Sequence, residues 1–245
     1  MRIAGILGSP HREGLTARLL QAALEGAQEA GAEVTLFRLA EQPLQACCAC
    51  KGDCWGRLQC VRDPKSTAWQ AQLQATDGLV MAVPVYCWQL PGLTSLFMDR
   101  MRWDTGSVLQ PRNPRAALGI ACAGGSGTGC VLALQALYRY FYNWAFHGIA
   151  PLPASRFNHA QALVEAKTRG ADLVAVIRAG IQPFSSLGAA MAHYETLPHM
   201  KETPLDELRL LVQWLRRGLV EHGVTLPFAF VQQADAAERA WQQGR

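Results

Sequence analysis

The segment RIAGILGSPHREGLTARLL (residues 2–20) carries the strongest fold signal in this chain. Its first part, residues 2–8, is a short apolar run with the length of a buried strand. A polar turn over 9–14 follows, and from Leu15 onward leucines and alanines recur at helical spacing. Residues 33–39 then alternate and predict a second strand. A strand, a turn, a helix and a strand in this order form the unit of a parallel α/β sheet.

The rest of the chain continues this alternation of strands and helices. Further strands are predicted over 78–83, 116–123 and, interrupted by Pro151 and Pro153, 148–154. Helices are predicted over 64–75, 92–102 and 131–146. Beyond residue 158 the pattern is mostly helical, and Thr203 before Pro204 predicts the start of a helix. We therefore expect a domain over 1–157, with a Cys-rich loop at 43–62, and a helical C-terminal segment over 158–245 that completes it.

Composition and charge exclude several classes of protein. Half of the 245 residues are hydrophobic and 17% are charged, which excludes disordered and fibrous chains. The net charge of +4 is too small to favour nucleic acid as a partner. No apolar leader follows Met1, and prolines or glycines break the uncharged stretches 78–98 and 116–138. We expect a cytoplasmic protein with no membrane association.

Three loops follow predicted strands at their carboxyl ends, where ligands bind in open parallel sheets. The first, residues 8–16, leads into the start of a helix, whose free N–H groups favour a phosphate. Ser9 and Thr16 add hydroxyl donors there, and Arg12 adds positive charge. Neither a Walker motif nor a dinucleotide fingerprint is present. A capped turn without a ligand is the alternative interpretation.

The composition of the other two loops suits contacts with a planar ring. Residues 84–92 contain two prolines, which make the loop rigid, and two aromatic residues, Tyr86 and Trp88. Residues 124–129 are rich in glycine and let the backbone approach a ligand closely. Each loop alone is weak evidence, because aromatic packing and glycine turns are common. Their convergence on one edge of the sheet is stronger evidence for a binding site.

These motifs resemble those of a known family. Gly8-Ser9-Pro10 through Thr16, then Pro84-Val85-Tyr86, Pro91-Gly92 and Phe97-Met98-Asp99-Arg100, are similar to the flavodoxin-fold NADPH-dependent FMN reductases. Within that group the Cys-rich loop resembles the iron–sulfur flavoproteins. The resemblance covers roughly residues 1–150. It implies a doubly wound α/β sheet of flavodoxin type with strand order 2-1-3-4-5, bound FMN, and NAD(P)H as co-substrate.

The resemblance also implies which residues contact FMN, with the 9–16 loop at the phosphate and the other two loops at the isoalloxazine ring. The implied residues are Ser9, His11, Arg12, Gly14, Leu15, Thr16, Pro84, Val85, Tyr86, Cys87, Trp88, Gln89, Gly124, Gly125, Ser126 and Gly127. The family usually has a basic residue at position 11 and often a polar one at position 15. No catalytic side chain is expected, because a flavin carries the chemistry itself.

Five cysteines fall between residues 47 and 60, a crowding typical of metal or redox chemistry. Cys47, Cys50, Cys54 and Cys60 have the spacing C-x2-C-x3-C-x5-C, and four thiolates can hold a [4Fe–4S] cluster. Iron–sulfur flavoproteins usually have one residue fewer before the third cysteine. Zinc and free thiols are the alternatives. We expect a cluster beside the flavin of the same or a neighbouring subunit.

The function expected from these features is FMN-dependent oxidoreduction. Electrons would pass from NAD(P)H or a protein donor to a small molecule such as a quinone, a nitro compound or a flavin. The alternatives are an FMN/iron–sulfur electron carrier without enzymatic activity, partnered by a redox protein, and a zinc-stabilised binding module without flavin. The low charge, the aromatic helix at 131–146 and an apolar stripe at 205–215 predict a homodimer or homotetramer.

Overall fold

In the computed structural model, which describes residues 1–42 and 44–243, the strands form one parallel sheet of order β2-β1-β3-β4-β5, with β6 also paired to β4. The strands are β1 (Arg2–Leu7), β2 (Glu33–Arg38), β3 (Gly78–Pro84), β4 (Arg115–Ala123), β5 (Phe146–Gly148) and β6 (Leu152–Ser155). This order confirms the predicted doubly wound fold. Pro43, at the start of the predicted Cys-rich loop, and residues 244–245 of the predicted C-terminal segment lie outside the described residues.

The fifth position of the sheet is shared by two short strands rather than by one strand over 148–154. β5 pairs with the beginning of β4, where Phe146 is opposite Arg115, and β6 pairs with its end, where Leu152 is opposite Ile120. Pro151 between them has no N–H for the ladder, which explains the interruption. The helix predicted to reach residue 146 ends at Asn143, because Phe146 already belongs to the sheet.

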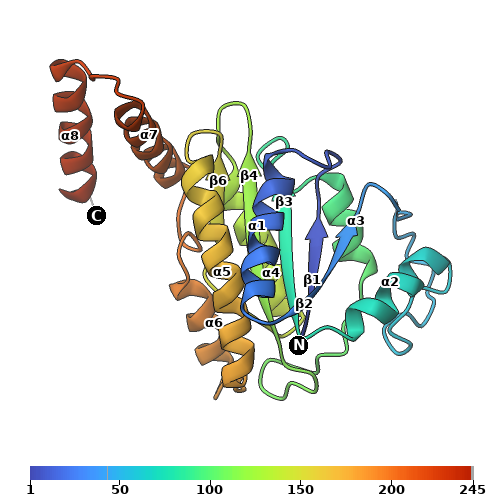
Figure 1. Ribbon diagram of the computed structural model, residues 1–245. Helices are drawn as coiled ribbons and strands as arrows, with labels where there is room; N and C mark the ends of the chain where they lie inside the picture. The colour runs from blue at the N-terminus through green and yellow to red at the C-terminus, as the bar shows by residue number, and fades with distance from the viewer. Residues whose placement is uncertain (43, 244–245) are drawn as a thin grey trace.

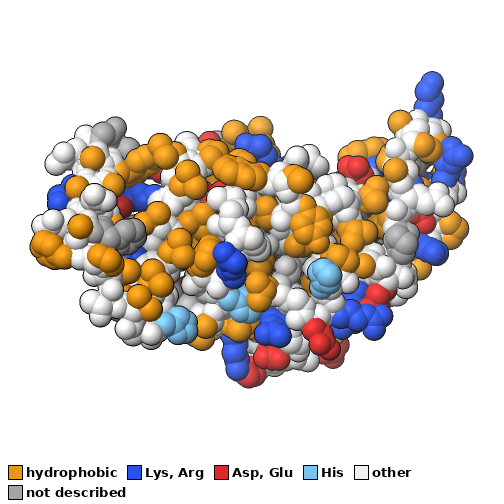
Figure 2. All heavy atoms as spheres, turned by 90° about the horizontal axis from the view of Figure 1, so that it is seen from above, with side chains coloured by type: hydrophobic (Ala, Val, Ile, Leu, Met, Phe, Trp, Pro, Cys, Tyr) orange, Lys and Arg blue, Asp and Glu red, His pale blue; other side chains and the backbone are white. Residues whose placement is uncertain are grey.

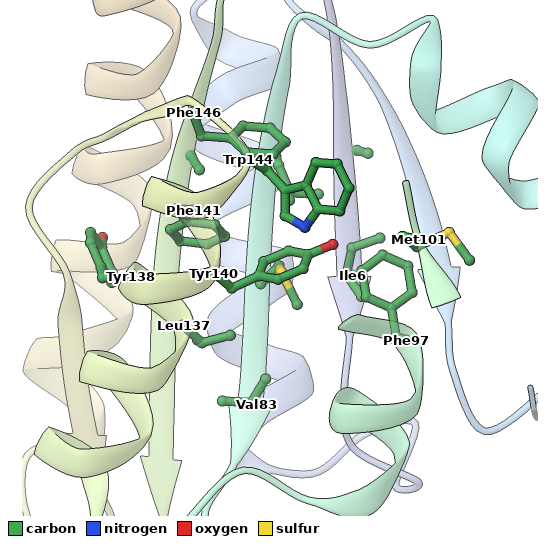
Figure 3. Packing of buried hydrophobic residues seen from close by; sticks show 14 of the residues in the cluster. Ile6, Val83, Phe97, Met101, Leu137, Tyr138, Tyr140, Phe141, Trp144 and Phe146 are labelled. Atoms are coloured by element: carbon green, nitrogen blue, oxygen red, sulfur yellow. The ribbon is translucent and has the colours of Figure 1, made fainter. Parts of the chain in front are cut away.

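Helices cover both faces of the sheet (Figure 1). One face carries α1 (Leu15–Glu29) and α5 (His159–Ala179). The other carries α2 (Pro64–Gln74), α3 (Gly92–Arg100), α4 (Cys130–Asn143) and α6 (Leu187–Thr196). The side chains of β3 alternate between the two cores: Met81 faces the second group of helices and Val80 the first. Figure 3 shows Phe97 of α3 and Leu137 of α4 over Ile6 and Val83 of the sheet.

The two helices of the first face cross at unusually short distance. A Cβ atom on Gly26 of α1 would overlap the carbonyl oxygen of Lys167, and one on Gly170 of α5 would overlap that of Ala23. The backbones touch because both positions lack a side chain. The α1–α5 contact therefore depends on two glycines from distant parts of the sequence, each of which faces the backbone of the other helix.

The C-terminal helix α7 (Pro204–Glu221) packs against α4 and then, with α8 (Phe228–Gln243), extends from the sandwich as an arm (Figure 1). The predicted start of α7 is confirmed: Pro204 lies in the first turn, and Thr203 and Asp206 form a capping box. Ion pairs of Arg209 with Glu238 and of Arg216 with Asp235 join the two helices. None of the helices in the described residues has the combined length and apolar character that crossing a bilayer requires.

Candidate functional site

A cavity of about 460 Å³ lies at the carboxyl edge of the sheet, between the loops that follow β1, β3 and β4. Figure 2 looks down on this edge of the molecule. The lining residues are Ser9, His11, Gly14, Leu15, Thr16, Pro84, Val85, Tyr86, Cys87, Trp88, Cys122, Ala123, Gly124, Gly125, Ser126 and Thr128. The three loops singled out from the sequence thus enclose one space.

The loop after β1 presents the start of α1 to this cavity. The N-cap is Gly14, no side-chain bond caps the helix among the described residues, and its first turn has no acidic residue. Ser9 is buried, and its Oγ accepts a hydrogen bond of 3.2 Å from the His11 backbone N–H. Thr16 is also buried. Uncapped N–H groups beside two hydroxyls form a site for an anion.

The loop after β3 is a tight hairpin held in a conformation that ordinary residues rarely adopt. The backbone N–H groups and carbonyls of Tyr86 and Gln89 exchange hydrogen bonds of 3.0 Å. Cys87 and Trp88 between them have φ values of +49° and +65°, although glycine or asparagine usually occupies such turns. Backbone strain of this kind persists where the surroundings enforce it, often at binding sites. The turn leaves Tyr86 and Trp88 about half exposed beside the cavity.

The loop after β4 can lie against this hairpin only because of Gly129. Gly129 has a φ of +98°, and a Cβ there would be 2.6 Å from Cγ1 of Val85 and 2.8 Å from Cα of Trp88. Any side chain at this position would separate the two loops. Ser126 and Thr128 share a hydrogen bond of 2.7 Å between their hydroxyls, which orders the middle of the loop.

Three of the residues expected at the flavin do not line the cavity. Arg12 forms an ion pair of 3.0 Å with Glu41 and lies on the surface. Gln89 closes the hairpin through its backbone. Gly127 packs under α7, where its Cβ position is 2.8 Å from Leu211.

Sequence reasoning missed other residues at the cavity: Cys122, Ala123 and Thr128. The first two are the last residues of β4, so the rule that ligands bind at strand ends could have found them. Burial raises the pKa of the Cys122 thiol to about 11. It also raises the pKa of the Cys130 thiol, so both thiols are protonated at neutral pH. Cys87, in the hairpin after β3, is exposed.

The Cys-rich loop encloses a second cavity of about 360 Å³. Its lining includes all five cysteines of the loop, Cys47, Cys48, Cys50, Cys54 and Cys60, together with Trp55, Arg100 and Arg102. The Cys60 sulfur accepts a hydrogen bond of 2.7 Å from Arg100, and the Cys48 sulfur accepts one of 3.4 Å from Arg62. A hydrogen bond from the Gly52 backbone holds the pKa of the Cys50 thiol below its ordinary value, assisted by Arg62.

This second cavity lies away from the first, and among the described residues the two share no lining residue. Arg100 ends α3, whereas Gly92 begins it near the first cavity, and a helix of this length spans about 12 Å. Trp55 stacks on Trp144, beyond the far end of α4, with ring centroids 5.3 Å apart. Within one chain, the Cys-rich loop therefore lies at the opposite ends of α3 and α4 from the first cavity.

The thiols of the second cavity have the chemistry of a cluster site. Guanidinium groups beside these thiols can offset the negative charge of a thiolate cluster. No three candidate ligand side chains among the described residues meet closely enough to hold a single metal ion. Four thiolates in one loop are a donor set that suits a cubane cluster or a tetrahedral zinc ion.

The fold and the first cavity define a flavodoxin-like protein with one phosphate-sized loop, and the residues present fit FMN. The family model described as NADPH-dependent FMN reductase matches residues 1–162. The chain belongs to this family, which confirms the resemblance inferred from the motifs.

Individual relatives agree with this assignment. An iron–sulfur flavoprotein of Archaeoglobus fulgidus is 30% identical over 101 residues, 41% of this chain and 46% of that protein. One of Methanosarcina thermophila is 33% identical over 100 residues, 41% of this chain and 52% of that protein. The matches thus span about half the length of these relatives. A solved NAD(P)H:quinone oxidoreductase of Methanothermobacter marburgensis shares the fold, with a TM-score of 0.55, 15% identity, and coverage of 71% of this chain and 98% of that chain.

Proposed function

We propose that this protein is an FMN-dependent oxidoreductase. It takes electrons from NAD(P)H or a protein donor and passes them to a small molecule such as a quinone, a nitro compound or a free flavin. The observation that carries the proposal is the cavity at the carboxyl edge, where an uncapped helix start adjoins the aromatic hairpin and the glycine-rich loop. Family membership supports the same cofactor.

Each loop has a distinct role in this proposal. The start of α1, with Ser9 and Thr16, binds the phosphate. Tyr86 and Trp88 stand beside the ring, and the Gly124–Ser126 backbone closes on its other side. FMN, when bound, supplies hydride and single-electron chemistry, so the chain has to position the ring and keep water away from it. The protonated Cys122 thiol borders the cavity without supplying a nucleophile.

Flavin titration and steady-state kinetics test this function. We expect one FMN per chain and discrimination against FAD, because a second phosphate motif is absent from the sequence. NADH and NADPH are then compared as donors with a quinone and a nitro compound as acceptors. Binding of FAD in place of FMN, or no flavin binding at all, would refute the proposal. A protein that binds FMN but accepts electrons from neither nucleotide would instead favour the protein-donor alternative.

We further propose that Cys47, Cys50, Cys54 and Cys60 hold a [4Fe–4S] cluster in the second cavity. The five thiols and the two arginines that line it support this ligand set. Anaerobically purified protein should contain iron and acid-labile sulfide. Cys54→Ser should remove the broad visible absorbance of a cluster and leave the FMN bands, whereas Cys48→Ser, in the same loop, should keep both. Zinc in place of iron, or metal-free thiols, would refute the cluster.

The same cavity gives weight to a second function, that of a non-enzymatic electron carrier. A cluster moves single electrons, so its presence favours exchange between redox proteins over hydride transfer to small molecules. The two functions are separated by stopped-flow reduction of the FMN-loaded protein. Fast reduction by NADH or NADPH supports the enzyme, and slow reduction by both, with fast reduction by a low-potential ferredoxin, supports the carrier.

The arm formed by α7 and α8 supports the proposed homodimer or homotetramer. The exposed apolar residues of α7 recur at intervals of three and four, the spacing of a coiled-coil seam. They are Leu205, Leu208, Val212, Leu215 and Leu219. Light scattering should return at least twice the chain mass at micromolar concentration. Leu208→Glu combined with Leu215→Glu should reduce it to the monomer, and a monomeric wild type would contradict the proposal.

A further inference from the structure

Helix α7 lies outside the matched segment of residues 1–162, yet it packs against the glycine-rich loop of the first cavity. The Cβ position of Gly127 is 2.8 Å from Cδ2 of Leu211, and Leu211 itself is buried. Trp214, one turn further along α7, is buried as well. The C-terminal arm therefore supports the backbone that we have placed beside the flavin ring.

Glu207 of α7 is the charged residue at this contact. It is 1% exposed, and its Oε1 accepts a hydrogen bond of 3.0 Å from the backbone N–H of Val131 in the first turn of α4. Its Oε2 is buried without a hydrogen-bond partner among the described residues. Burying a carboxylate in this way is costly unless a positive group compensates it. The start of α4, with the positive end of its helix dipole, provides that compensation.

The remote position of this carboxylate follows from the geometry of the loop. A helix start is usually capped by a side chain at the N-cap residue itself. In α4 that residue is Gly129, whose φ of +98° and contact with Val85 and Trp88 exclude a side chain. The close approach of the two flavin loops therefore removes the local cap. Glu207, which is 76 residues away from Val131 in sequence, takes its place.

We propose that Glu207 is a positioning residue of the flavin site. By capping α4, it fixes the Gly124–Gly129 loop in the position that closes on the isoalloxazine ring. The inference rests on the proposed FMN site and adds α7 to it. Glu207 acts through the backbone and touches neither the phosphate nor the ring. Its loss should therefore weaken binding of the ring portion that FMN and riboflavin share.

The test compares flavin affinities of three variants by fluorescence titration. Glu207→Ala should lower the binding affinities for FMN and for riboflavin by the same factor, about tenfold. This is the effect expected when one hydrogen bond to a charged group is lost. Glu207→Gln keeps an acceptor for Val131 and should restore most of the affinity. The control is Glu221→Ala, which removes an exposed carboxylate from the same helix and should leave the affinities for both flavins unchanged. The visible band of bound FMN should also lose resolution in Glu207→Ala alone.

Several results would overturn the inference. Unchanged affinity and spectrum in a folded Glu207→Ala would do so, as would a loss confined to FMN, because that pattern belongs to the phosphate loop. If Glu207→Ala does not fold, Glu207→Asp decides: its shorter side chain should weaken both flavins, and unchanged affinities refute the inference. A wild type that binds neither flavin refutes the proposed function as well, whereas failure of this inference alone leaves wild-type binding intact.

Discussion

Arg100 should determine whether the Cys-rich loop keeps its shape. This arginine is buried at the end of α3, and its guanidinium reaches both ends of the loop. Nε and Nη2 donate hydrogen bonds of 2.5 and 2.8 Å to the carbonyls of Gln45 and Ala46, just before the first cysteine. Nη1 donates one of 2.7 Å to the sulfur of Cys60, the last cysteine. One planar side chain thus ties the beginning of the loop to its end.

Arg100→Lys isolates the effect of this geometry. The substitution keeps the positive charge but removes the planar guanidinium, whose several N–H donors reach both ends of the loop. A lysine ammonium placed at one end of the loop cannot reach the other, so we expect about two of the three hydrogen bonds to be lost. At about 1.5 kcal/mol for each bond from a charged donor, the loss is about 3 kcal/mol. That is a large part of the 5–15 kcal/mol that typically stabilises a domain.

Two assays measure this effect. Labelling of Cys60 by a thiol reagent should accelerate about a hundredfold, the factor that corresponds to about 3 kcal/mol of local opening. Denaturant unfolding shows how much of the loss is global. Arg57→Lys, an exposed arginine of the same loop, is the matched control and should change neither measurement. Equal labelling rates in Arg100→Lys and wild type would show that the guanidinium does not hold the loop closed.

Three further changes test other parts of the molecule. Changing both Ser9 and Thr16 to alanine should weaken FMN binding by about 1–3 kcal/mol, with riboflavin almost unaffected; equal losses would place the phosphate elsewhere. Gly170→Ala should lower the free energy of unfolding by about 1–3 kcal/mol, because its Cβ overlaps a backbone carbonyl of α1, whereas Gly188→Ala has room for its methyl group. Burial lowers the pKa of His147 to about 4, so its contribution to stability is complete above its ordinary pKa of 6.5 and is lost as the pH falls through about 4. His147→Phe should therefore lose less stability between pH 7 and pH 4 than the wild type, and an equal loss in denaturant unfolding would refute this.

The fold could be predicted from the sequence because its signals are local. Residues 3–7 and 78–84 are buried on both faces, and parallel strands of this kind appear as continuous apolar runs. The boundary between α4 and β5 could not be predicted in this way. Residues 144–146 have the same apolar character in a helix as in a strand, and pairing of Phe146 with Arg115, far away in sequence, decides between them.

The candidate site shows the same difference between features set by local sequence and features set by long-range contacts. The convergence of three loops follows from parallel topology alone, so the sequence could predict the cavity. The direction of Arg12 could not be predicted, because it depends on Glu41 from the loop after β2. Nor could the role of Gly129 be predicted, since its contact with Val85 and Trp88 appears only once the hairpin has folded. Glu207 gave no signal, because it lies in a helix that looks amphipathic and ordinary.

The position of the Cys-rich loop links the assembly of the chains to the redox role of the thiols. Arg100 and Trp144 hold the loop beyond the ends of α3 and α4, whereas the first cavity lies at the start of both helices. Within one chain, the helices and their core therefore separate the thiols from the flavin cavity. A second chain that brings its Cys-rich loop against this cavity would shorten the path between the thiols and the flavin. Separating the chains with Leu208→Glu and Leu215→Glu should then leave FMN affinity unchanged and slow any electron exchange between thiol site and flavin.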